Sequence, residues 1–62
     1  MHSMKDKDLL KLLIKDGWKE VNIEGSHHKL EKDGFQHITI PVHGKDLGKG
    51  LLSKILKQAG LK

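Results

Sequence analysis

The chain has 62 residues, no cysteine and a formal net charge of +4 at pH 7. This length supports one small domain with a modest core, so we expect a single domain over residues 1–62 with an irregular segment 1–5. The lack of cysteine excludes disulfides and thiolate-bound metals. No apolar run approaches the roughly 18 residues of a membrane span, and the polar N-terminus is unlike a signal peptide, so we expect a cytoplasmic protein.

The excess positive charge is confined to the C-terminal half. Residues 1–33 carry seven lysines and seven acidic residues, whereas residues 34–62 carry five lysines and one acidic residue, Asp46. A one-sided positive field attracts polyanions, above all nucleic acid, although the same lysines would also serve as a solubilising surface. There is no arginine, and lysine contacts favour binding without strong sequence choice.

The first two elements are predicted from their apolar periodicity. A helix is expected over residues 6–16, capped by Asp6 or Ser3 and ended by Gly17. Its apolar face consists of Leu9, Leu10, Leu13 and Ile14. Residues 18–25 then predict a half-buried strand, because Val21 and Ile23 alternate with polar side chains.

Residues 27–42 predict two further strands joined at Asp33-Gly34, which is a strong hairpin signal. A two-residue loop would place Leu30 on the face opposite Ile38. A three-residue loop, 32–34, keeps the aliphatic residues on one face, and a buried face favours that register. It pairs Glu31 with Phe35. The inward set is then His28, Leu30, Gln36, Ile38 and Ile40, and the outward set is His27, Lys29, His37 and Thr39.

The last segment predicts a second amphipathic helix, ending at Gly60. Its apolar stripe is Leu47, Leu51, Leu52, Ile55, Leu56 and Ala59. The order helix, three antiparallel strands, helix indicates an α+β fold with both helices on one face of the sheet. The other face is left open to solvent.

The stretch "GSHHKL", residues 25–30, places two histidines in one strand. Neighbouring strand residues face opposite sides, so His27 is exposed and His28 points toward the helices. An exposed imidazole can exchange protons near neutral pH. His27 as general base, with Lys29 stabilising charge on the phosphate, is the minimum for metal-free RNA cleavage through the 2′-hydroxyl. There are two alternatives: His27 is an inert surface histidine, or it forms a metal site with His37.

Several motifs together resemble the HicA mRNA interferase toxins. These are "GW" after a leucine-rich helix, then "GSHHKL", "ITIPVHGKDL" and "ILKQAGL", which follow one another over residues 8–61. The resemblance implies a double-stranded-RNA-binding-domain-like fold and a bacterial toxin that cleaves mRNA with the histidine directly after Gly-Ser, here His27. It also implies neutralisation by a HicB-type antitoxin. Glu24 departs from the family pattern, in which the residue before "GSH" is usually basic, and Leu30 stands where an aromatic residue is common.

The expected site therefore has His27 as its catalytic residue and no cofactor. The expected RNA-binding residues are Ser26, Lys29, Lys45, Lys49, Lys54 and Lys57. We expect His43 to shape the loop before the second helix and Trp18 to belong to the core, with base stacking as the alternative for Trp18. The expected function is that of a metal-independent endoribonuclease toxin. The alternatives are a non-catalytic RNA-binding module of the same fold and a protein-binding domain that meets an acidic partner.

Overall fold

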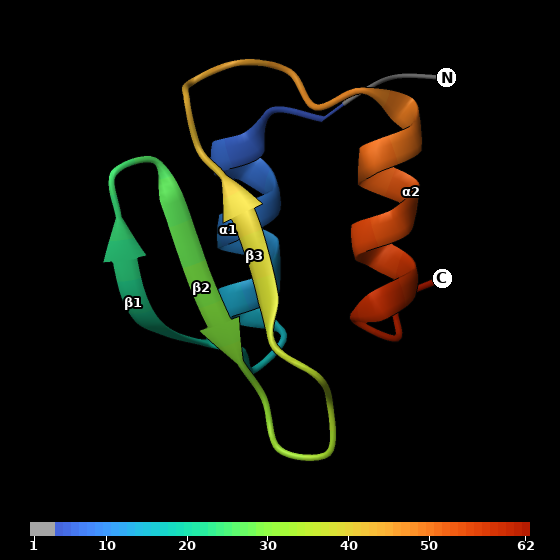
Figure 1. Cartoon of the computed structure of the whole chain (residues 1–62). Helices are drawn as coiled ribbons and strands as arrows, with labels where there is room; N and C mark the ends of the chain where they lie inside the picture. Colours follow the sequence, from blue (N-terminus) through green and yellow to red (C-terminus); the bar gives the residue numbers. More distant parts are fainter. Residues whose placement is uncertain (1–3) are drawn as a thin grey trace.

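The computed structural model describes residues 4–62 and has the expected α+β architecture (Figure 1). The elements follow in the order α1 (Asp6–Lys15), β1 (Lys19–Glu24), β2 (His27–Glu31), β3 (Ile38–Pro41) and α2 (Lys49–Gln58). The strands form an antiparallel sheet in the order β1-β2-β3. Helix α1 lies behind the sheet, and α2 lies next to it beyond β3.

The core lies between the inner face of β2 and β3 and the two helices. Leu30, Ile38 and Ile40 lie on that face and are buried. The rest of the buried apolar cluster is Leu9, Leu13, Trp18, Leu47, Ile55 and Ala59. The predicted helical stripes are wrong at two positions, since Ile14 is 48% exposed and Leu51 is 39% exposed. The buried face of each helix is therefore narrower than its apolar stripe in the sequence.

Both helices end as their glycines predict. After α1, the Trp18 N–H donates to the Leu13 carbonyl, and after α2 the Leu61 N–H donates to the Leu56 carbonyl. Each bond joins an N–H to the carbonyl five residues earlier, which is typical of a helix that ends at a residue in the left-handed conformation. Gly60 has a φ of +75°, and a Cβ there would lie 3.0 Å from the Phe35 ring. Glycine at position 60 is therefore required both by its backbone conformation and by this close approach.

The predicted three-residue loop between β2 and β3 is wrong, although the faces predicted for the strand residues 27–30 and 38–40 are right. Gln36, predicted to point inward, is exposed in the loop. A turn does form at residues 32–35, where the Phe35 N–H donates to the Lys32 carbonyl. The Phe35 ring then packs against Trp18, with ring centroids 5.5 Å apart, which takes this segment out of the sheet. Strand pairing resumes only at Ile38, so His27 lies opposite Pro41 instead of Thr39. This two-residue slip preserves the side-chain faces, because the strand period is two.

The prediction that Val21 and Ile23 share a buried face is wrong. The register of β1 against β2 shifts between Glu20 and Asn22, so β1 contains an irregularity at Val21. Every residue of β1 is exposed, with Val21 and Ile23 about half accessible. The reason is position: β1 is the edge strand farther from the helices, because α1 lies behind β2 and β3 and α2 lies beyond β3 (Figure 1).

Asp6 does not cap α1 in the predicted way. Lys5 occupies the N-cap position without a side-chain cap, and Ser3 lies outside the described residues. The buried Asp6 carboxylate instead accepts backbone N–H groups from His43, Gly44 and Lys45 at 2.6, 3.0 and 3.2 Å, and a fourth from Lys7. The structure thus assigns His43 a backbone role in the loop before α2.

We call this arrangement the Asp6 clasp: one carboxylate that holds the loop 43–45 against the start of α1. Two further backbone bonds extend it, from the Asp6 N–H to the Lys45 carbonyl and from the Leu47 N–H to the Met4 carbonyl. Burial alone would raise the pKa of the Asp6 carboxyl. The four amide donors outweigh burial and hold its pKa below the ordinary value of 3.8.

The inner face also receives His28, as predicted. Its Nδ1 lies 3.1 Å from the Glu20 carboxylate, and the two side chains are 18% and 26% exposed. His28 pairs with Ile40 across the sheet. The imidazole therefore closes the margin of the core, and the Glu20 carboxylate fixes the orientation of its ring.

We expect Asp6→Asn to lower the melting temperature at neutral pH more than Asp8→Asn, an exposed acidic residue in the same helical turn. The lowered pKa means that the charged form of Asp6 stabilises the fold. That contribution is complete above the ordinary carboxyl pKa and is lost as pH falls through the lowered one. The gap between wild type and Asp6→Asn should therefore shrink in acid. Equal melting temperatures for the two variants at neutral pH would contradict the clasp.

We expect His28→Ala to destabilise the protein by about 1–3 kcal/mol, because the substitution opens the core margin and leaves Glu20 without its partner. His27→Ala should have a small effect, since that side chain is exposed. Thermal or urea unfolding of both variants measures the difference. A larger loss for His27→Ala would show that the face assignment is inverted.

Candidate functional site

The turn between β1 and β2 sets the position of His27. Glu24 pairs with His27, so only Gly25 and Ser26 form the turn. Gly25 has a φ of +60° while Ser26 has a negative φ, which is the pattern of a two-residue turn with glycine first. The Ser26 carbonyl accepts the Val42 N–H at 2.7 Å and so ties the turn to the end of β3. His27 is thus held at a fixed corner of the sheet.

His27 and Lys29 lie together on the outer face of the sheet. His27 is exposed at the start of β2, and Lys29 is two residues further, about 6.6 Å along the strand. Their partners on β3 are Pro41 and Thr39, respectively. Among the described residues, neither helix covers this face, because α1 lies behind the sheet and α2 lies beyond β3 (Figure 1). An imidazole and an ammonium group are therefore available to one ligand in solvent.

Glu24 lies directly opposite His27 on β1. Cβ atoms of such cross-strand pairs are about 5 Å apart. A carboxylate at this distance opposes a phosphate group at the site but attracts the cationic form of the imidazole. The sequence departure at position 24 is therefore part of the site and not of a remote surface.

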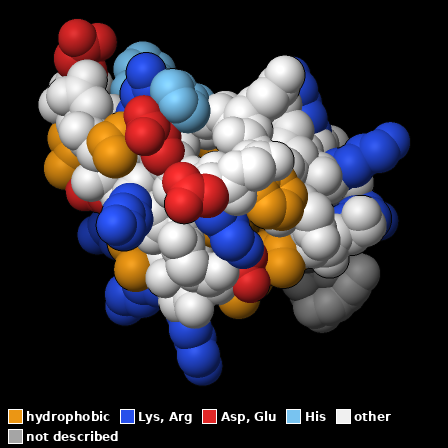
Figure 2. All heavy atoms as spheres, turned by 90° about the horizontal axis from the view of Figure 1, so that it is seen from below, with side chains coloured by type: hydrophobic (Ala, Val, Ile, Leu, Met, Phe, Trp, Pro, Cys, Tyr) orange, Lys and Arg blue, Asp and Glu red, His pale blue; other side chains and the backbone are white. Residues whose placement is uncertain are grey.

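The structure does not bring the remaining predicted RNA-binding lysines onto this face. Lys45 is exposed in the loop held by the Asp6 clasp, and the other three are exposed on α2, namely Lys49, Lys54 and Lys57. Viewed from the end that carries the β2–β3 loop, lysines project around the rim with acidic side chains between them (Figure 2). Lys29 and Ser26 adjoin His27, whereas the α2 lysines form a separate group beyond β3.

Two other candidate residues do not join His27 on the outer face: His37 differs from the expectation, whereas Trp18 is buried in the core as expected. His37 was placed on the strand face with His27, but it lies in the loop 32–37 and pairs with Glu31 at 3.1 Å. Trp18 is 2% exposed and cannot stack on a base without unfolding. Among residues 4–62, no three histidine or acidic side chains lie close enough to hold a metal ion. The helices of this same range are all too short and too polar to cross a bilayer.

Sequence reasoning missed Asp6 as the organiser of the loop that carries Lys45. The only signal was its place at a helix start, which predicts a local cap, whereas its main partners lie at residues 43–45.

Comparison with protein families assigns most of this chain to one family. A search of curated proteins finds no match to this chain. The family model described as "HicA toxin of bacterial toxin-antitoxin" matches residues 7–61. This range contains the whole sheet, the turn at Gly25-Ser26 and both helices, except for Asp6 at the start of α1. The chain therefore belongs to the HicA toxin family.

Proposed function

We propose that this toxin is an endoribonuclease that cleaves mRNA, with His27 as its general acid or base. One observation carries the proposal: of the histidines in the described chain, His27 is the one whose strand position places it on the uncovered face of the sheet. Lys29 follows it on the same face, and the Ser26–Val42 bond fixes the turn. RNA cleavage needs a proton acceptor and a nearby positive charge, and His27 and Lys29 supply these two groups on one face.

The proposed reaction uses the nucleophile that RNA itself supplies. His27 accepts the proton of a ribose 2′-hydroxyl, and the 2′-oxygen attacks the adjacent phosphorus. A bond forms between phosphorus and the 2′-oxygen, the bond to the 5′-oxygen breaks, and the leaving 5′-oxygen takes a proton from solvent water. His27 later returns its proton to solvent. Lys29 stabilises the charge that develops on the phosphoryl oxygens, and in this proposal the Ser26 hydroxyl donates a hydrogen bond to one of them. None of these steps requires a metal ion or a cofactor.

Substituting His27 with alanine should lower the RNA cleavage rate by about 100- to 10,000-fold, which is the usual contribution of a general acid or base. The same substitution should abolish growth inhibition on expression. His43→Ala is the matched control, because that histidine is exposed in the loop after β3 and makes its contact to Asp6 through the backbone N–H and not through the imidazole. Cleavage is followed on a labelled transcript in EDTA. Full activity of a folded His27→Ala protein would sink the catalytic assignment.

We further propose that Lys45, Lys49, Lys54 and Lys57 hold the RNA backbone. Helix α2 lies beside β3, so an RNA strand that crosses the outer face and passes β3 reaches these lysines next (Figure 1). The lysines of α1 have acidic neighbours in the same helix, among them Asp6 and Asp8, and attract phosphate less.

Each of these lysines replaced by alanine should flatten the dependence of log affinity on log salt by about 0.7 for single-stranded RNA. Lys7→Ala, Lys11→Ala and Lys15→Ala serve as controls on α1. Binding is measured over a series of salt concentrations. Equal changes of slope for both groups would argue against a footprint on α2.

The partner that we propose is a HicB-type antitoxin that covers His27 together with part of the lysine surface. Acidic groups on the antitoxin would complement this surface and speed association. Labelled RNA and antitoxin should then compete for His27→Ala protein. If both bind at once without weakening each other, inhibition has to act through a change of conformation instead of occlusion.

A further inference from the structure

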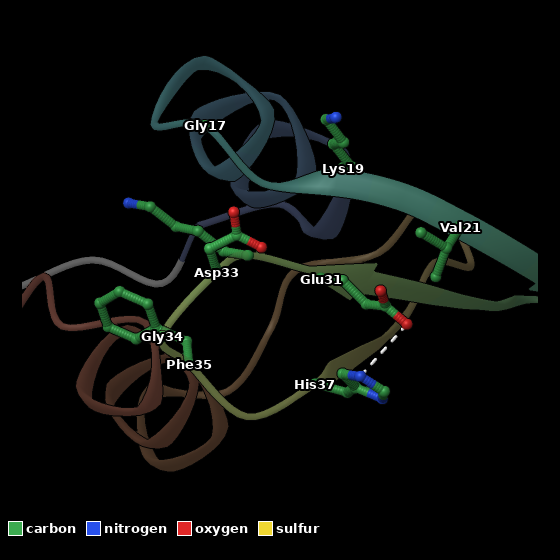
Figure 3. Close-up of a pocket in the computed structure, with 9 residues that line it drawn as sticks. Gly17, Lys19, Val21, Glu31, Asp33, Gly34, Phe35 and His37 are labelled. Atoms are coloured by element: carbon green, nitrogen blue, oxygen red, sulfur yellow. Dashed lines mark ion pairs between the residues drawn. The ribbon is translucent and has the colours of Figure 1, made fainter.

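The end of the outer face farthest from His27 is hollowed into a groove of about 590 Å³. This volume falls within the roughly 300–1,000 Å³ typical of small-molecule sites. The groove lies between the α1–β1 turn, β1, the end of β2 and the loop 32–37. Figure 3 shows Phe35 on one side of it and the Glu31–His37 pair on the other. Neither the catalytic proposal nor the lysine footprint uses this groove.

Phe35 supplies a fixed aromatic surface to the groove. It is one of only two aromatic residues in the chain, and it stays 41% exposed while Trp18 is buried beneath it. Trp18 contacts it in a tilted arrangement, and Gly60 leaves just enough space for its ring edge. The Lys32 ammonium lies 5.1 Å from the ring centroid. The same ammonium lies over the ring and pairs with the Asp16 carboxylate at 3.0 Å, which offsets its charge. The part of the rigid ring that stays exposed suits a flat ligand.

Glu31 supplies a hydrogen-bond acceptor on the opposite side. One carboxylate oxygen, Oε2, lies 3.1 Å from the His37 Nε2, which orients the group. The carboxylate is 44% exposed, so it remains open to a ligand. An ionised carboxylate only accepts hydrogen bonds. Lys19 lies opposite Glu31 on β1 and offers a second cation at the rim.

We propose that the groove binds one base of the RNA substrate and selects a base with an exocyclic amino group over uracil. This subsite presupposes the RNA substrate proposed above. The base packs against Phe35, and its amino group donates to Glu31. Lys19 faces a flanking phosphate. Uracil turns two carbonyl oxygens toward the carboxylate on either side of its single N–H, so it is the disfavoured base.

The groove and the proposed catalytic residue can act on one RNA strand. His27 and Glu31 share the outer side of β2 and are four positions apart, which is about 13 Å along the strand. A strand of a few nucleotides spans that distance. The groove would therefore read a base close to the cleaved bond and give a preference that lysine contacts alone do not provide.

A first experiment locates the base without relying on catalysis. Cytidine and uridine 5′-monophosphates are titrated into the protein while backbone amide NMR signals are recorded. Cytidine monophosphate should shift the signals of residues 31–37 at lower concentration than uridine monophosphate does. Equal responses to the two nucleotides, or shifts confined to α2, would overturn the subsite.

A second experiment assigns the selectivity to Glu31. Short deoxycytidine and deoxyuridine oligonucleotides are compared, because they lack the 2′-hydroxyl and cannot be cleaved by the proposed reaction. Wild-type protein should bind the cytidine strand about tenfold more tightly, as one specific base contact allows. Glu31→Gln should erase that ratio, since an amide both donates and accepts. Asp33→Asn removes an equal charge from the same groove and should keep it.

The outcomes separate the two proposals. If the ratio is one for wild type, or survives Glu31→Gln, the subsite is wrong even where RNA is cleaved at His27. If the ratio behaves as expected but His27→Ala still cleaves RNA, the catalytic assignment fails and the base subsite stands.

Discussion

The pairing of β2 with β3 is the constraint on which the rest of the molecule depends. Leu30 lies opposite Ile38, and His28 opposite Ile40, so the aliphatic residues of both strands enter one core. The alternation of a strand then leaves no choice for the neighbours: His27 and Lys29 have to face outward. Burying three aliphatic side chains thus determines where the imidazole and the ammonium group of the candidate site lie. The site needs no buried charge and no strained backbone.

The remaining elements hold the paired strands β2 and β3 in place at both ends. At one end, the Asp6 clasp fixes the loop that follows β3, and the Ser26–Val42 bond joins the histidine turn to the same segment. At the other end, Phe35 packs between Trp18 and Gly60 and holds the loop 32–37 against both helix ends. The first device positions the proposed catalytic corner. The second creates the groove in which we place a base of the RNA.

The sequence carries enough information to predict the order of elements and the faces of the central strands. The face assignment of His27 and His28 tolerated an error of two residues in register, because a slip of two leaves each side chain on its own side. The true loop length could not be predicted, since it depends on the docking of Phe35 against Trp18 and Gly60. The irregularity at Val21 and the clasp formed by Asp6 likewise depend on tertiary contacts that local periodicity does not encode. As a consequence, His37 lies at the groove and not beside His27, where the predicted register placed it.

The central claim is that the outward histidine, and not its inward neighbour, meets the RNA. The most direct measurement follows the imidazole signals of His27 and His28 by NMR while a short RNA with 2′-deoxy substitutions is added, so that binding occurs without cleavage. We expect large shifts of the His27 ring and of the Lys29 and Thr39 amides, with the His28 ring unchanged against Glu20. Shifts of His28 that exceed those of His27, or shifts restricted to α2 and the loop 43–48, would contradict it.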